Sequence, residues 1–129
     1  MRLLLDTHAF LWWVDGTHPV GRRARTAVAN PDNDVFLSIA SCWEIAIKVS
    51  LGKLRLPKPA DRFIADQVSL NGFTLLEASL RHVCRVADLP FHHRDPFDRV
   101  LIAQSLIDEI PIVSNERVFD AYGVHRIWQ

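Results

Sequence analysis

Short apolar runs alternate with longer amphipathic segments along the whole chain. Five runs have the length and composition of buried strands, at 3–5, 35–38, 73–76, 110–113 and 124–127. Helical spacing, or a helix-ending signal such as Gly52, marks the segments 8–14, 22–29, 39–51, 61–70, 79–86, 97–107 and 116–122. Because strand and helix alternate, the sequence predicts an α/β fold in which helices cover both faces of a central parallel sheet of four to five strands.

The length of 129 residues suits one domain, spanning 1–129, with a core large enough to fold without a metal or a disulfide. Its 15 basic residues equal its 15 acidic residues, so the formal net charge is zero. A freestanding nucleic-acid binder usually has a basic excess, which this chain lacks. A basic rim around an acidic pocket would cancel in the total, however, so neutrality does not argue against a nuclease.

Cysteine usage and hydropathy favour a cytoplasmic protein. Cys42 and Cys84 lie in helical segments without metal-ligand spacing, and we expect both to be buried free thiols, as in a reducing compartment. The apolar start at 3–5 is too short for a signal peptide, and no later run approaches the roughly 18 residues of a membrane span. We therefore expect no membrane association.

Four acidic residues fall next to the expected carboxyl ends of strands: Asp6, Glu44, Asp98 and Glu116. Asp6 and Glu116 follow the first and fourth strands, and Glu44 lies in the helix after the second. Asp98 begins the helix that runs back across the sheet to the fourth strand. Ligands of open parallel sheets bind beyond the carboxyl ends of the strands, so we expect the four acids to share one crevice.

Each acid also has a simpler structural interpretation. Asp6 is a good helix N-cap, and Glu44 completes a capping-box pattern that begins at Ser41. Asp98 and Glu116 suit the first turn of a helix, where a negative charge favours the helix dipole. These roles explain each acid singly and leave their common location unexplained.

A cluster of carboxylates is costly without a cation, since two of them about 4 Å apart repel by about 4 kcal/mol at an effective dielectric near 20. Oxygen ligands with no cysteine nearby suit Mg²⁺ or Mn²⁺ better than zinc. Such an ion activates water and offsets charge on a phosphate, so phosphodiester hydrolysis is the predicted chemistry.

Four stretches resemble the successive motifs of PIN-domain proteins, and most nearly the VapC-type toxins of bacterial and archaeal toxin–antitoxin systems. They are LLLDTH at 3–8, SIASCWEI at 38–45, RDPFDRVLIAQ at 94–104 and IVSNE at 112–116. The similarity covers essentially the whole chain, and the ordered set of motifs is specific. The resemblance implies a PIN-like three-layer α/β/α fold and an endoribonuclease that depends on Mg²⁺ or Mn²⁺. It also implies a cognate VapB-like antitoxin and a homodimer.

By this resemblance, Asp6, Glu44 and Asp98 match the first three acids of the family. Glu116 stands where the family usually has aspartate, and Ser114 replaces a common threonine. The implied metal ligands are therefore Asp6, Asp98 and Glu116, while Glu44 either ligates the ion or positions the attacking water. We expect Asp95, in the same motif as Asp98, to structure its loop or to touch metal only indirectly.

Three further residues are expected to contact substrate: Thr7, Ser114 and Arg99. For Arg99 a phosphate contact and a surface ion pair are equally good interpretations. His92 and His93 suggest zinc, but adjacent residues rarely present their side chains to one ion. Their loop instead shapes access of the substrate.

Surface chemistry gives two further expectations. Four basic residues either follow an RNA backbone or form a solvated helix end: Lys48, Lys53, Arg55 and Lys58. Trp12 and Trp13 either both pack in the core or leave one ring exposed for a partner or a base. An amphipathic antitoxin helix is expected to cover an apolar surface formed by Trp12, Leu51, Leu54 and Leu56.

Two other functions remain open from the sequence. A PIN-fold binding module without catalysis is supported only by glutamate in place of aspartate at Glu116. A DNA structure-specific nuclease is less favoured, because the chain is small and adds no DNA-binding element. RNA cut by metal-activated water would carry a 3′-hydroxyl and a 5′-phosphate.

Overall fold

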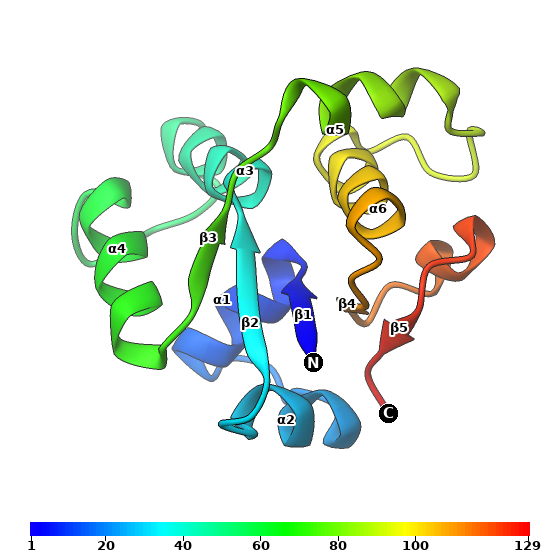
Figure 1. Ribbon diagram of the computed structural model, residues 1–129. Helices are drawn as coiled ribbons and strands as arrows, with labels where there is room; N and C mark the ends of the chain where they lie inside the picture. Colours follow the sequence, from blue (N-terminus) through cyan, green and yellow to red (C-terminus); the bar gives the residue numbers. More distant parts are fainter.

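A computed structural model describes all residues, 1–129, and contains one parallel sheet. Its five strands lie in the order β3-β2-β1-β4-β5 (Figure 1). Their bounds are β1 Arg2–Leu5, β2 Asp34–Ser38, β3 Thr74–Leu76, β4 Ile112–Val113 and β5 Arg126–Ile127. Every neighbouring pair is parallel, so the predicted α/β class and sheet are confirmed.

Helices connect the strands, close to the segments predicted from periodicity. They are α1 Thr7–Asp15, α2 Arg22–Ala29, α3 Ile39–Ser50, α4 Ala60–Asn71, α5 Leu80–Arg85 and α6 Pro96–Asp108, with the 3₁₀ helices η1 Val86–Asp88 and η2 Arg117–Tyr122. The predicted helix at 116–122 is thus a 3₁₀ helix. None of the helices is long and apolar enough to cross a membrane.

The middle strand β1 separates two hydrophobic cores. Leu3 and Leu5 point into one core, and Leu4 points into the other, as the alternation of side chains along a strand requires. The first core includes side chains from α1, α2, α3 and α4, and the second includes α6 and η2 (Figure 1). The expected three-layer α/β/α arrangement is therefore present.

Helix α6 is buried around most of its circumference. The five successive residues from Leu101 to Ser105 are all buried, so no single apolar face distinguishes this helix. The Gln104 side chain even donates a hydrogen bond from within the core to the carbonyl of Glu77, at 3.1 Å. This burial holds the N-terminus of α6, with Asp98, at a fixed place beside the sheet.

The order of strands reverses between β1 and β4. The chain builds β1, β2 and β3 in one direction, then returns through α6 to place β4 on the other side of β1. The connections after β1 and β4 therefore leave the sheet in different directions, and open parallel sheets bind ligands at the carboxyl edge beside such a reversal. Asp6 and Glu116 lie in the chain just beyond these two strand ends.

Side-chain N-caps fix where α1 and α3 begin. The Asp6 carboxylate accepts from the backbone of Ala9 at 2.7 Å, so its capping role is confirmed. The Ser38 hydroxyl accepts from the backbone N–H of Ala40, so the N-cap of α3 is Ser38, three residues before Ser41. The capping-box interpretation of Glu44 is therefore wrong, because that residue lies in the second turn of α3.

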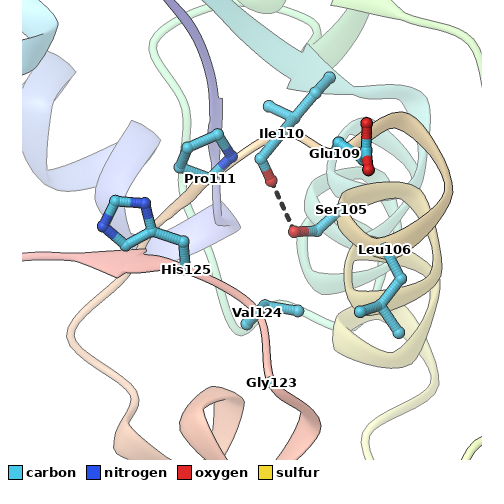
Figure 2. A pocket seen from close by; sticks show the side chains of 8 residues that line it. All are labelled: Ser105, Leu106, Glu109, Ile110, Pro111, Gly123, Val124 and His125. Atoms are coloured by element: carbon cyan, nitrogen blue, oxygen red, sulfur yellow. Dashed lines mark hydrogen bonds between the residues drawn. The ribbon is translucent and has the colours of Figure 1, made fainter.

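The opposite edge of the sheet carries a different hollow, of about 370 Å³ (Figure 2). It is lined by Ser105, Leu106, Glu109, Ile110, Pro111, Gly123, Val124 and His125, which lie at the end of α6 or just before β4 and β5. Glu109 is its only carboxylate. The acids that follow the strands are therefore at the other edge of the sheet.

The two cysteines are unpaired, as predicted, but they are less buried than predicted. Both are free thiols, but Cys84 is exposed and Cys42 is only partly buried. Burial raises the pKa of Cys42 to about 11. Cys84 is exposed because the short helix α5 contributes no side chain to either core.

The C-terminal segment depends on the absence of a side chain at Gly21. A Cβ atom there would lie 2.2 Å from the backbone oxygen of Trp128, which also accepts a hydrogen bond from Ala24. We expect Gly21→Ala to lower the free energy of unfolding by about 1–3 kcal/mol, because a backbone oxygen cannot move aside as a flexible side chain can. Urea unfolding measures this change, and an unchanged midpoint would contradict the prediction.

Candidate active site

Asp6 is held at the end of β1 by hydrogen bonds to both carboxylate oxygens. Besides the cap to Ala9, its Oδ2 accepts from the Ser114 hydroxyl at 2.6 Å. Ser114 lies just after β4, and its own oxygen accepts from the backbone N–H of Glu116 at 2.9 Å. These bonds link the ends of β1 and β4. The Ser114 hydroxyl is thus engaged in hydrogen bonds within the protein.

Glu44 is buried and is bonded through both of its oxygens. Thr7, the first residue of α1, donates its hydroxyl hydrogen bond to Oε1 at 2.6 Å and lies 3.0 Å from the Ser41 hydroxyl. The Lys48 ammonium lies 2.8 Å from Oε2, one helical turn further along α3. Lys48 is thus the positive partner of one of the four acids, which neither sequence interpretation of this lysine anticipated.

Asp98 lies in the first turn of α6, as predicted. Its backbone N–H donates to the Asp95 carboxylate at 2.9 Å, which confirms that Asp95 structures this loop. Its side-chain Oδ2 lies 2.7 Å from Nε2 of His93. His92 points elsewhere, with its ring against Tyr122. The sequence signal that could have identified His93 is its position directly before the motif at 94–104, five residues before the acid.

Arg99 does not form the surface ion pair that was one of its two expected roles. The residue is 4% exposed, and its two terminal nitrogens donate to the carbonyls of Val86, Leu89, Pro90 and His93 at 2.9–3.1 Å. All four terminal N–H groups are therefore used within the loop before α6. Helix α6 therefore carries Asp98 and, one residue later, the guanidinium that organises the loop. Because the terminal N–H groups of Arg99 are engaged with these carbonyls, the expected phosphate contact is disfavoured.

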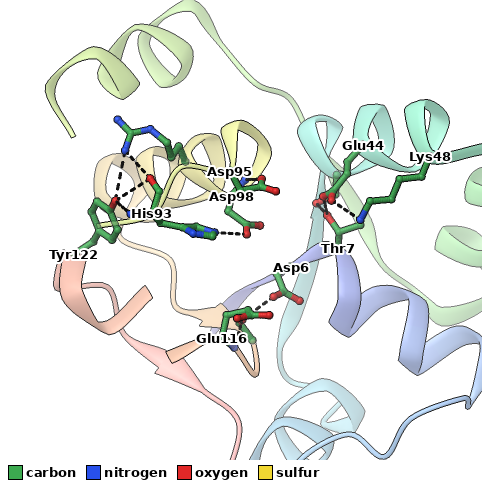
Figure 3. A network of polar contacts seen from close by, with 12 residues as sticks. Asp6, Thr7, Glu44, Lys48, His93, Asp95, Asp98, Glu116 and Tyr122 are labelled. Atoms are coloured by element: carbon green, nitrogen blue, oxygen red, sulfur yellow. Dashed lines mark hydrogen bonds and ion pairs between the residues drawn. The ribbon is translucent and has the colours of Figure 1, made fainter. Parts of the chain in front are cut away.

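The four acids lie around one space at the carboxyl edge of the sheet, although they come from four separate segments. Figure 3 shows Asp6 and Glu116 on one side of this space, Asp98 above them and Glu44 across from Asp98. The Glu116 carboxylate makes no hydrogen bond, and neither does Oδ1 of Asp98. Two acids of the cluster thus retain free oxygen ligands.

Burial makes the negative charge of this cluster unfavourable. Desolvation raises the pKa of Asp6 to about 6, against the lowering effect of the hydrogen bonds from Ser114 and Ala9. Desolvation likewise raises the pKa of Asp98 to about 7, helped by the nearby charges of Asp95, Asp6 and Glu44 and opposed by the bond from His93. The carboxylates are therefore close enough to sense one another electrostatically.

A model of the PIN domain family matches residues 3–124. The chain belongs to the PIN domain family. It is 38% identical over 58 residues to "Ribonuclease VapC16" of Mycobacterium tuberculosis, a match that covers 45% of this chain and 41% of that protein. The matched region thus spans less than half of this relative.

Two solved structures share the fold of this PIN domain. VapBC2 from Rickettsia felis, bound to a DNA fragment from their promoter, aligns with a TM-score of 0.75 at 14% identity and covers all of both chains. FitAcB from Neisseria gonorrhoeae aligns with a TM-score of 0.61 at 16% identity, over 96% of this chain and 95% of that one. At these identities the likeness establishes the fold.

The donor chemistry of this PIN domain fits a hard divalent cation. Its free ligands are carboxylate oxygens, and the raised pKa values of Asp6 and Asp98 reflect charge that a cation would offset. As the side chains stand, no three carboxylate, imidazole or thiol groups lie close enough to hold one ion. Binding would therefore require the carboxylates to move closer together around the ion.

The raised pKa values predict how the stability of the metal-free PIN domain changes with pH. Between about pH 4 and 7 the native state keeps protons on Asp6 and Asp98 that the unfolded chain has lost. The free energy of unfolding should therefore fall as the pH rises through this window.

Asp98→Asn removes one of these groups. The difference in the free energy of unfolding, variant minus wild type, should therefore increase by about 1 kcal/mol or more from pH 4.5 to pH 8. Urea unfolding in the presence of a chelator measures both curves. Parallel curves for the two proteins would refute this assignment.

Proposed function

We propose that this PIN domain is a toxin-type endoribonuclease that hydrolyses RNA phosphodiesters with Mg²⁺ or Mn²⁺. The observation that carries the proposal is the convergence of Asp6, Glu44, Asp98 and Glu116 on one space beyond the carboxyl ends of the neighbouring strands β1 and β4. A structural role for each acid would not require the four to gather at one place. The partial relative named a ribonuclease supports the same activity.

In the proposed mechanism, Asp6, Asp98 and Glu116 would hold the ion. When bound, the ion would supply Lewis-acid chemistry, acidifying water and offsetting charge on the scissile phosphate. Glu44, held by the Thr7 hydroxyl, would orient the attacking water and accept its proton. The neighbouring Lys48 ammonium balances the charge of Glu44 in this position. The predicted substrate contacts of Thr7 and Ser114 would then be indirect, through the acids to which they are bonded.

Asp6→Asn should lower the rate of RNA cleavage by about 100-fold or more, because the amide keeps the shape of the side chain and removes the charge. Cleavage of a labelled RNA hairpin with Mn²⁺ measures the rate. Asp61→Asn, an exposed acid on α4, is the matched control and should cleave like wild type.

The products and a second substrate distinguish the alternatives. Water attack predicts a 3′-hydroxyl and a 5′-phosphate, so a 2′,3′-cyclic phosphate would contradict the mechanism. A DNA hairpin of the same sequence tests the DNA-nuclease alternative, which preferential cleavage of DNA would support. Wild type that binds RNA and cleaves neither substrate with any divalent metal would instead indicate a binding module.

We also propose that a VapB-like antitoxin helix inserts apolar side chains into a largely apolar hollow of about 260 Å³ beside α1 and α4. Its apolar lining consists of Leu11, Val14, Leu54, Leu56, Pro57 and Phe63, and Asp15, Arg55 and Gln67 complete it. Two members of the surface expected from the sequence are therefore present, Leu54 and Leu56. Trp12 is instead half-buried among other aromatic rings, stacked on His18 and in contact with Trp128.

Leu56→Glu should weaken antitoxin binding at least about tenfold, or about 1.4 kcal/mol, because a carboxylate would enter the apolar hollow. RNA cleavage by the variant alone should be unchanged. Leu70→Glu is the control, since Leu70 is 78% exposed on α4 and outside the hollow. Calorimetric titration with the product of the neighbouring gene gives the affinities, and equal affinities for the two variants would reject this surface.

Light scattering of the free chain tests the expected homodimer.

A further inference from the structure

The loop between η1 and α6 has its backbone fixed by two side chains. Arg99 donates from its terminal nitrogens to the carbonyls of Leu89, Pro90 and His93 in this loop and to one carbonyl of η1. The Tyr122 hydroxyl, from η2, donates to the carbonyl of Pro90 at 2.7 Å and accepts from the backbone N–H of His93 at 2.9 Å. Both polar groups of the His93 backbone are thereby held in place.

The His93 ring is directed by this backbone toward the third acid. Its edge packs against the buried ring of Phe119, with 6.3 Å between the ring centres, and its Nε2 lies 2.7 Å from Oδ2 of Asp98 (Figure 3). When Asp98 is ionised, as a metal ligand must be, Nε2 carries the hydrogen in this contact, because an ionised carboxylate can only accept. One oxygen of Asp98 is therefore fixed, and the other has no hydrogen-bond partner.

From this geometry we propose that His93 is a positioning residue that orients the carboxylate of Asp98 toward the shared crevice, with Arg99 and Tyr122 holding His93 in place. The inference rests on the proposed function, in which Asp98 is a metal ligand. A donor on one carboxylate oxygen fixes the side-chain rotamer and directs the remaining oxygen at the ion, as the partners of metal ligands commonly do. His93 itself touches neither substrate nor ion in this arrangement.

His93→Phe and His93→Gln separate the hydrogen bond from the packing of the ring. Phenylalanine keeps the contact with Phe119 and has no donor, whereas glutamine keeps an N–H donor without the ring. The probe is Mn²⁺ alone, titrated calorimetrically without RNA. We expect His93→Phe to weaken Mn²⁺ binding about 10–100-fold and His93→Gln to restore most of it. The KM for RNA at saturating Mn²⁺ should stay within a few-fold of wild type.

A double variant tests whether His93 acts through Asp98. In the Asp98→Asn background, His93→Phe should cause no further loss of Mn²⁺ affinity. Tyr122→Phe provides an independent variant, outside the acid cluster, that releases the backbone of His93. It should weaken Mn²⁺ binding in the same direction and by less than His93→Phe does.

Three results would overturn the inference. Wild-type Mn²⁺ affinity in His93→Phe would show that the hydrogen bond does not orient Asp98. A lower kcat with unchanged Mn²⁺ affinity would make His93 a proton-transfer residue instead. A full further loss in the Asp98→Asn background would show that it acts elsewhere. Wild type that neither binds Mn²⁺ nor cleaves RNA would refute the proposed function itself, a result distinct from these three.

Discussion

The carboxylates of Asp6 and Asp98 are held largely out of water at the carboxyl edge of the sheet, beyond the ends of β1 and β4. A buried carboxylate loses hydration, and each negative neighbour adds repulsion, so the pKa values of both rise well above the usual range of aspartate. Only a packed framework can keep such groups together, since relaxed side chains would turn toward solvent. The two hydrophobic cores on either side of β1 supply that framework.

Three of the four acids are paired with a hydrogen-bond donor from another segment or turn of the chain, and these pairs connect the segments that carry the acids. Ser114 after β4 donates to Asp6 after β1, and Thr7 at the start of α1 donates to Glu44 on α3. His93 makes the corresponding contact with Asp98. Each donor offsets part of the desolvation of its acid and fixes its direction. Glu116 alone has no such partner, which leaves its longer side chain free to adjust.

Much of the architecture follows from local patterns in the chain. The apolar run at Leu3 to Leu5, too short for a helix, could only be a buried strand, and its alternation assigned Leu4 and its neighbours to opposite faces. Parallel strands then brought Asp6 and Glu116 to one edge, because their carboxyl ends must lie together. The capping-box pattern at Ser41 was misleading, since the hydroxyl of Ser38 caps the helix three residues earlier.

The sequence by itself determined the alternation of strand and helix, the edge of the sheet on which the acids lie and, through its motifs, the PIN family. Local propensity and side-chain periodicity are enough for these features, because they depend on residues close together in the chain. Only the tertiary structure decided that Arg99 turns inward to the loop and that Lys48 pairs with Glu44. Long flexible cations can reach several partners, and which partner is available depends on packing between segments that the sequence pattern leaves unplaced.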